Sequence, residues 1–143
     1  MKILLDTNIV LDALGSREPF CRDAEQIILS AAAGHVQGFL TANAVTDIVY
    51  VLRKQLTGDV LKQRMTDLMD VLPVLDVNEA DCRAAFSQVL SDYEDALMLQ
   101  CAQRHGLDAV VSRDAALLKY DTRPNGIDVL SPQMLLDSLS DAT

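Results

Sequence analysis

The sequence predicts a parallel α/β fold in which helices cover both faces of a sheet. Short apolar runs of strand length alternate along the chain with longer stretches of helical periodicity. A strand buried on both faces has a continuous apolar run, and an intervening helix allows successive strands to be parallel. The 143 residues are 50% hydrophobic, with dispersed charges and no linker, so we expect one domain over residues 1–143.

The elements follow from the apolar runs and from the residues that begin and end helices. Asp6-Thr7-Asn8 reads as a loop after the first strand, and Gly34, Gly58 and Gly106 as helix ends. Ser91 and Glu94 have the spacing of a capping box that opens a helix. Strands are expected at 3–5, 36–40, 74–77, 109–112 and 127–130. Helices are expected at about 18–33 and from 41 or 43 to 57, and a further helical stretch reaches about residue 71. Helices are also expected at 78–90 and 91–105, briefly after 114, and from 132.

Composition narrows the classes of function. A net charge of -9 argues against a protein that holds nucleic acid mainly through a large basic surface. It does not exclude a nuclease, because a bound cation makes an acidic site attractive to phosphate. The first apolar run is too short for a signal peptide, and no stretch reaches the roughly 18 apolar residues of a membrane span. We therefore expect a cytoplasmic protein without a membrane segment.

The cysteines and histidines point away from disulfides and zinc. Cys21, Cys82 and Cys101 are odd in number and widely spaced, which predicts buried free thiols. Only His35 and His105 could supply imidazole ligands, and no cysteine pair has ligand spacing. Closely spaced glycines of a phosphate-binding loop are also missing from the sequence, which argues against ATPases and dehydrogenases.

Four aspartates stand where a shared site could form. Asp6 and Asp114 follow apolar strands, so both fall at the carboxyl edge of a parallel sheet, where such folds bind ligands. Asp47 shares a helical face with Ala44, Tyr50 and Val51, and Asp95 shares one with Met98, Leu99 and Ala102.

Carboxylates gathered in this way repel one another and need a compensating cation to stay ionised. Oxygen ligands with almost no His or thiolate select Mg²⁺ or Mn²⁺. The alternatives from the pattern alone are helix caps for Asp6 and Asp114, and solvent exposure for Asp47 and Asp95.

These residues carry a resemblance to a known family. Residues 5–12, the helix bearing Asp47, residues 92–97 and residues 111–114 resemble the motifs of PIN domains, in that family's order. The resemblance covers roughly residues 1–136. It extends, through residues 17–20 and 44–54, to the bacterial subgroup related to VapC-type toxins. It implies a three-layer α/β/α sandwich with a central parallel sheet, and metal-dependent endoribonuclease activity.

The resemblance also assigns roles and partners. Asp6, Asp47, Asp95 and Asp114 match the catalytic positions that bind metal, and Thr7, Asn8 and Ser112 match polar supporting positions. Asp47 stands where many members have Glu, which shortens the side chain by one methylene group. An RNA substrate, a cognate antitoxin and a homodimer are implied if the chain is a VapC-like toxin.

Several residues near these positions are weaker candidates. Arg53, Lys54 and Arg113 are the basic residues nearest the predicted site and could bind substrate phosphates. Two tyrosines could stack on an unpaired base, and two further aspartates could orient a ligand, although packing and helix capping explain these residues as well. They are Tyr50, Tyr93, Asp12 and Asp92. Glu94 is assigned to the capping box.

Two other functions stay open at this stage. A haloacid-dehalogenase-like phosphatase would use Asp6 as its nucleophile, but Asn8 occupies the position where that chemistry expects a second Asp. A PIN-like module that binds nucleic acid or protein without cleavage is the other alternative. Metal binding without turnover would distinguish it.

Overall fold

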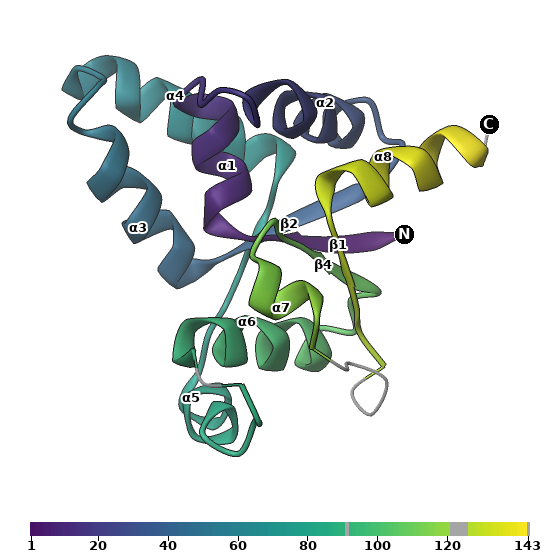
Figure 1. Ribbon diagram of the computed structural model, residues 1–143. Helices are drawn as coiled ribbons and strands as arrows, with labels where there is room; N and C mark the ends of the chain where they lie inside the picture. The colour runs from purple at the N-terminus through teal and green to yellow at the C-terminus, as the bar shows by residue number, and fades with distance from the viewer. Residues whose placement is uncertain (91, 121–125, 143) are drawn as a thin grey trace.

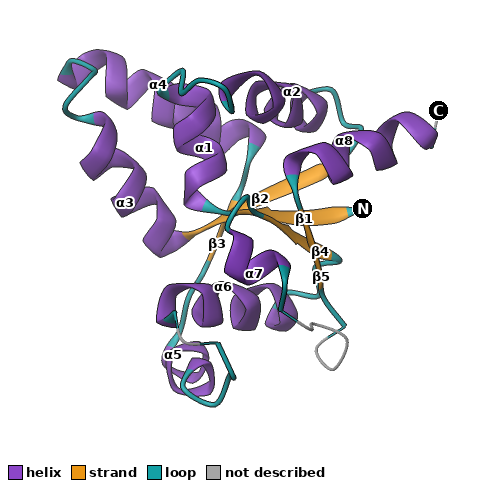
Figure 2. Cartoon of the chain, in the orientation of Figure 1, coloured by secondary structure: helices purple, strands orange, loops and turns teal. Residues whose placement is uncertain are grey.

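A parallel sheet forms the centre of the computed structural model, which describes residues 1–90, 92–120 and 126–142. In this part of the chain the sheet has five strands in the order β3-β2-β1-β4-β5, and every paired strand is parallel (Figure 2). The strands are β1 (Lys2–Leu5), β2 (Gln37–Thr41), β3 (Val74–Leu75), β4 (Ala109–Val111) and β5 (Asp128–Leu130). All five predicted strands are confirmed.

Helices lie on both sides of this sheet (Figure 1). They are α1 (Thr7–Leu14), α2 (Cys21–Ala32), α3 (Ala42–Leu52), α4 (Gly58–Val71), α5 (Glu79–Ala85), α6 (Tyr93–Arg104), α7 (Ala115–Leu118) and α8 (Pro132–Asp141). Helices α1 to α4 and α8 cover one face, whereas α6 and α7 cover the other, with α5 packed against α6. The predicted three-layer α/β/α architecture is confirmed.

The alternation of side chains along β1 divides the core into two layers. Ile3 and Leu5 pack into the cluster beneath α1 to α4 and α8, and Leu4 packs into the cluster beneath α6 and α7. All three side chains are buried, as expected for a central parallel strand covered on both faces. The carboxyl end of β1, and hence Asp6, is thereby held at the middle of the sheet.

The strand order creates a crevice beside Asp6. From β1 the chain builds outward through β2 to β3 and then returns to place β4 on the other side of β1. Leu5 pairs with Val111, and the Asp6 N–H donates to the Val111 carbonyl at 2.9 Å. Ligands bind outside the carboxyl ends of strands at such a reversal of order, because the connecting segments diverge there.

Some helix boundaries differ from the sequence-based expectation. The predicted loop at Asp6-Thr7-Asn8 is wrong, since α1 begins at Thr7 with Asp6 as its N-cap. Residues 9–13 of α1 are all buried, and at eight residues the helix is too short for its period to be recognised in the sequence. Gly58 begins α4 instead of ending α3, which stops at Leu52.

The capping boxes also fall elsewhere. The N-cap of α6 is Asp92, whose side chain accepts the Asp95 N–H, and Ser91 of the predicted box lies outside the described residues. A complete capping box is present instead at α5, between Asn78 and Asp81. Helix α5 ends at Ala85, short of the predicted residue 90.

Two expectations about the chain as a whole can be compared with the structure. The three cysteines are free, with Cys21 and Cys101 buried as predicted and Cys82 only half-buried. None of the helices in the described part of the chain combines the length and apolar character needed to cross a membrane.

Candidate active site

A cavity of about 310 Å³ opens at the carboxyl ends of β1 and β4. Most of the residues around it are acidic, and those the structure describes there include no Lys, Arg or His. The lining is Asp6, Thr7, Asn8, Asp47, Tyr50, Val51, Asp92, Glu94, Asp95 and Asp114. A smaller hollow of about 30 Å³ shares Asp6, Asp47, Glu94 and Asp95 with it. The four aspartates singled out in the sequence therefore meet around one space.

Asp6 is held by the strand beside it. The Ser112 hydroxyl, fully buried after β4, donates to Asp6 Oδ2 at 2.8 Å and accepts the Asp114 N–H at 3.0 Å. Burial raises the pKa of Asp6, and the hydrogen bond from Ser112 acts in the opposite direction. Ser112 thus links the two carboxylates that follow neighbouring strands.

Asp114 is also the N-cap of α7. The N–H groups of Ala116 and Leu117 donate to its Oδ1 at 2.8 and 3.1 Å. A carboxylate has about four acceptor positions, so capping through one oxygen leaves acceptor capacity directed to the cavity. The cap and the ligand interpretations of Asp114 are therefore compatible.

Asp47 and Asp95 reach the cavity from two different helices. Asp47 is half-buried on α3, one position before the fully buried Ile48. The predicted face of Asp47 is only partly right, because Ala44 is buried but Tyr50 is 56% exposed. Asp95 lies in the first turn of α6, and its predicted neighbours Met98, Leu99 and Ala102 are buried.

The acidic side chains perturb one another. Burial, followed by the charges of Asp92, Asp6, Asp114 and Glu94, raises the pKa of Asp95 to about 7. Burial and neighbouring carboxylates likewise raise the pKa of Glu94. A cluster in which ionisation is this unfavourable is typical of functional sites, because a bound cation would relieve the repulsion.

The donor chemistry of the cavity suits a hard divalent cation. Its lining offers carboxylate, hydroxyl and amide oxygens, which are ligands for Mg²⁺ and Mn²⁺. Among the described residues, no group of three or more His, Cys, Asp or Glu side chains has an arrangement that could itself hold a metal ion. The type of donor therefore fits the cation, while the side chains as they stand do not form a closed coordination shell.

Glu94 is a cavity residue that the sequence interpretation missed. The pattern assigned it to a capping box, but it lines the cavity together with Asp47 and Asp95. The run Asp92-Tyr93-Glu94-Asp95 contains three acids at the start of one helix. Such a density of charge beside an expected ligand was the sequence feature that could have identified Glu94.

The weaker candidates separate into two groups. Tyr50 is on the cavity wall, with the Arg53 guanidinium 4.0 Å from its ring centroid and the Lys54 ammonium 5.9 Å away. Arg113 instead pairs with the buried Asp12, so neither residue is part of the lining. Tyr93 is not on the cavity wall either, since its hydroxyl donates to the Cys82 carbonyl at 2.7 Å.

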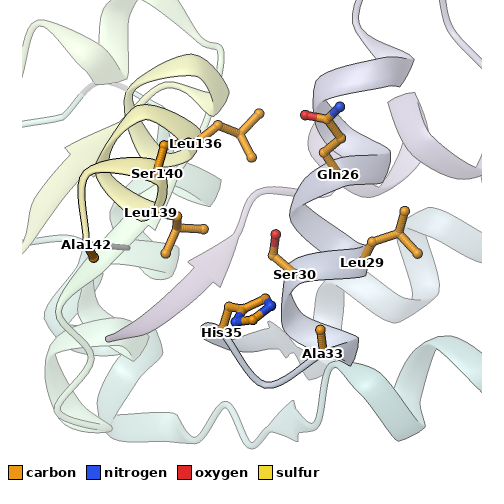
Figure 3. Close-up of a pocket in the computed structure, with 9 residues that line it drawn as sticks. All are labelled: Gln26, Leu29, Ser30, Ala33, His35, Leu136, Leu139, Ser140 and Ala142. Carbon is orange, nitrogen blue, oxygen red and sulfur yellow. The ribbon is translucent and has the colours of Figure 1, made fainter.

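A larger hollow of about 690 Å³ lies between α2 and α8 (Figure 3). Leu136 and Leu139 of α8 face Gln26 and Ser30 of α2 across it. The lining contains no acid, and His35 is its one titratable side chain among the described residues. Size alone does not make it the chemical site, because catalysis needs groups that hold charge or protons.

Fold and site together define an α/β protein with an acidic ligand site at the reversal of strand order. A family model described as the PIN domain matches residues 2–116, and the chain belongs to this family. The predicted resemblance is confirmed, and the haloacid-dehalogenase alternative is set aside.

Solved structures with the same fold come from several bacteria. The chain is 21% identical to FitAcB from Neisseria gonorrhoeae (TM-score 0.67), covering 92% of this chain and 98% of that one. It is 20% identical to a chain of a toxin-antitoxin complex from Klebsiella pneumoniae (TM-score 0.66; 91% and 97% covered). For VapBC2 from Rickettsia felis, bound to a promoter DNA fragment, identity is 15% (TM-score 0.61; 92% and 98% covered). No curated protein matches the chain.

Proposed function

We propose that the chain is a divalent-metal-dependent endoribonuclease that hydrolyses RNA phosphodiester bonds. The observation that carries this proposal is the convergence of Asp6, Asp47, Asp95 and Asp114 on one cavity at the carboxyl edge of the sheet. These carboxylates come from four separate segments of the chain. Membership of the PIN-domain family supports the same activity, since members of this family are generally nucleases.

The proposed cofactor is Mg²⁺ or Mn²⁺. Asp6, Asp95 and Asp114 would hold the principal ion, and Asp47 would complete the acidic cluster. When bound, such an ion supplies Lewis acidity that activates water and neutralises charge on phosphate oxygens. The raised pKa of Asp95 supports this proposal, because a cation is the simplest means of keeping several close carboxylates ionised.

The chain's own residues would position both ligands and substrate. Ser112 holds one oxygen of Asp6 and so fixes the direction in which its other oxygen points. Thr7 and Asn8 line the same cavity and offer neutral donors to a phosphate oxygen without adding to the negative charge.

We place the RNA next to Tyr50. Its exposed ring could stack on an unpaired base, and Arg53 and Lys54 stand on the same short segment to contact phosphates. Stacking of this kind requires a base that is free of its partner. We therefore expect single-stranded RNA to be the preferred substrate, with Arg53 and Lys54 as its phosphate contacts.

The biological setting we propose is that of a cytoplasmic toxin neutralised by an antitoxin. The similar structures from Klebsiella pneumoniae and Rickettsia felis are described as a toxin-antitoxin complex and as VapBC2, and this supports the assignment. A homodimer is part of the same proposal. Co-expression with the product of a neighbouring gene, followed by copurification and loss of cleavage, would test the pairing.

The activity is tested by cleavage of a mixed-sequence single-stranded RNA with Mg²⁺ or Mn²⁺, with and without chelator. The Asp95→Asn variant should lose cleavage, whereas Asp67→Asn, an exposed aspartate on α4, should cleave as the wild type does. Binding of Mn²⁺ by inhibitor-free wild-type protein without any cleavage would favour the alternative of a non-catalytic PIN-like binding module.

A further inference from the structure

An ion pair between the half-buried Arg113 and the buried Asp12 ties helix α1 to the loop that carries Ser112 and Asp114. Asp12, on α1, is only 1% exposed. The Arg113 guanidinium donates from Nε to Asp12 Oδ2 at 2.7 Å and from Nη2 to Oδ1 at 3.1 Å. Such a bidentate ion pair fixes the orientation of the planar guanidinium as well as its distance from the carboxylate.

Other contacts keep Arg113 in this place. The Phe20 ring lies against its guanidinium, with 4.1 Å between the guanidinium carbon and the ring centroid. Arg17 approaches the same Asp12 carboxylate at 3.9 Å. Arg113 therefore directs Nε and Nη2 to Asp12 on α1, and it does not line the acidic cavity.

The two ends of this link matter for the site. Arg113 stands between Ser112 and Asp114 in the chain, while α1 begins immediately after Asp6. Ser112 already joins the loop to Asp6 at the start of α1. Asp12 lies six residues further along, about 9 Å at 1.5 Å per residue. The ion pair thus adds a second, distant attachment point to the hydrogen bonds around Ser112, and two points so far apart hold the loop against rotation.

We infer that Asp12 and Arg113 are positioning residues that set the separation between the carboxylates of Asp6 and Asp114. This inference rests on the proposed metal-dependent function and revises the expectation that Arg113 contacts substrate. Neighbours that orient metal ligands commonly change metal affinity or activity by about 10-fold to 100-fold when they are removed. A positioning role thus predicts a loss in metal binding and turnover, with no change in substrate affinity.

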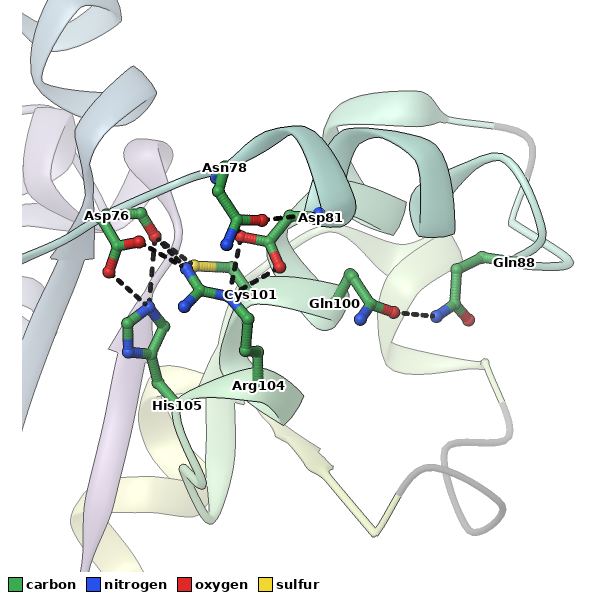
Figure 4. Close-up of polar contacts among 8 residues, drawn as sticks. All are labelled: Asp76, Asn78, Asp81, Gln88, Gln100, Cys101, Arg104 and His105. Carbon is green, nitrogen blue, oxygen red and sulfur yellow. Dashed lines mark hydrogen bonds and ion pairs between the residues drawn. The ribbon is translucent and has the colours of Figure 1, made fainter.

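The chain offers a matched control in a second ion pair, which also joins a half-buried arginine to a buried aspartate (Figure 4). Arg104 donates from Nε to both oxygens of the buried Asp81, at 2.8 and 3.0 Å, and from Nη2 to the Asp76 carbonyl. It lies at the far end of α6, nine residues or about 14 Å from Asp95. Arg104→Gln should therefore lower stability much as Arg113→Gln does, without touching the acidic cavity.

The test compares Arg113→Gln, Arg113→Lys, Asp12→Asn and Arg104→Gln at a temperature where all are folded by circular dichroism. Mn²⁺ affinity is measured by electron paramagnetic resonance, and kcat and KM on a single-stranded RNA oligonucleotide. We expect Arg113→Gln to weaken Mn²⁺ binding and lower kcat by about 10-fold or more with unchanged KM. Arg113→Lys should recover part of this loss, and Arg104→Gln should bind Mn²⁺ as the wild type does.

The inference is overturned if Arg113→Gln keeps wild-type Mn²⁺ affinity, or if Arg104→Gln loses as much Mn²⁺ affinity as Arg113→Gln does. A raised KM at unchanged kcat would instead make Arg113 a substrate contact. Because Asp12 and Arg113 act as one unit, the double variant Asp12→Asn with Arg113→Gln should lose no more Mn²⁺ affinity than either single variant. Wild-type protein that binds Mn²⁺ but leaves RNA intact would refute only the nuclease proposal. The Mn²⁺ affinities of the variants would still decide whether Asp12 and Arg113 are positioning residues.

Discussion

Ser112 and Asp6 are joined by a hydrogen bond of 2.8 Å that spans 106 positions of sequence. The same hydroxyl accepts the Asp114 N–H, so one fully buried oxygen sets the relative position of two carboxylates. This relation exists because β1 and β4 are neighbours in register, with Leu5 paired to Val111. The acidic site is consequently a product of sheet topology.

Replacing Ser112 by alanine should impair the site without unfolding it. The change removes the donor to Asp6 and the acceptor for Asp114, and we expect about a 10-fold to 100-fold weaker Mn²⁺ affinity. Isothermal titration with Mn²⁺ measures the effect. Ser131→Ala, which removes the N-cap of α8, should lower stability by about 1 kcal/mol and leave Mn²⁺ binding intact. Equal Mn²⁺ affinities in the wild type and Ser112→Ala would contradict the assignment.

The metal-free protein should become less stable as pH rises. Burial and the charges of Asp92, Asp6, Asp114 and Glu94 raise the pKa of Asp95 from 3.8 to about 7. Between these values the folded state holds a proton that the unfolded state has lost, so the free energy of unfolding falls with rising pH over this window. Thermal melts in chelator from pH 4 to pH 8 should show this fall. In Asp95→Asn the free energy of unfolding should fall less steeply with pH. An unchanged slope would contradict the raised pKa of Asp95.

Neutralising the two cations beside Tyr50 should weaken binding of RNA and spare the chemical step. The double variant Arg53→Gln with Lys54→Gln should raise KM several-fold. On single strands each phosphate contact contributes about 0.7 to the salt slope, so loss of both contacts should lower that slope by about 1.4. Steady-state cleavage at several salt concentrations measures both. The control is Arg83→Gln, which replaces an exposed arginine paired with Glu79 on α5. The same change in KM and salt slope in this control would contradict a specific role for Arg53 and Lys54.

Replacing Gly38, the glycine of β2, should destabilise the sheet. A Cβ atom on this β2 residue would lie 2.5 Å from Leu72 Cδ2 and 3.6 Å from Ala31 Cβ, and Leu72 is fully buried. We expect Gly38→Ala to lower the free energy of unfolding by about 1–3 kcal/mol, as measured by urea denaturation. Gly58→Ala, where nothing lies within 4 Å, should be neutral or slightly stabilising. Comparable losses at both positions would show that packing against Leu72 is not the cause.

Much of the fold could be predicted because its determinants are local. The apolar runs mark all five strands, and a parallel sheet brings the residues after β1 and β4 to one edge. That argument places Asp6 and Asp114 together, and helical periodicity predicts inward faces for Asp47 and Asp95, of which that of Asp47 is only partly right. The roles of these residues remain a proposal.

Other features could not be predicted because they depend on contacts distant in sequence. Arg113 and Asp12 are 101 positions apart, and nothing in either segment indicates the pair. Helix α1 has only eight residues, fewer than the roughly 11–18 over which a helical period is normally recognised. Glu94 was assigned to a local cap, while the structure gives that role to Asp92.

The central claim is that the four aspartates hold a divalent cation. The most direct measurement is an anomalous difference map from a crystal of the protein grown with Mn²⁺. The proposal predicts a Mn²⁺ peak in the cavity, with oxygens of Asp6, Asp95 and Asp114 at roughly 2.0–2.4 Å from it. A saturating concentration of Mn²⁺ that leaves the cavity without a peak, or places the ion elsewhere, would contradict the claim.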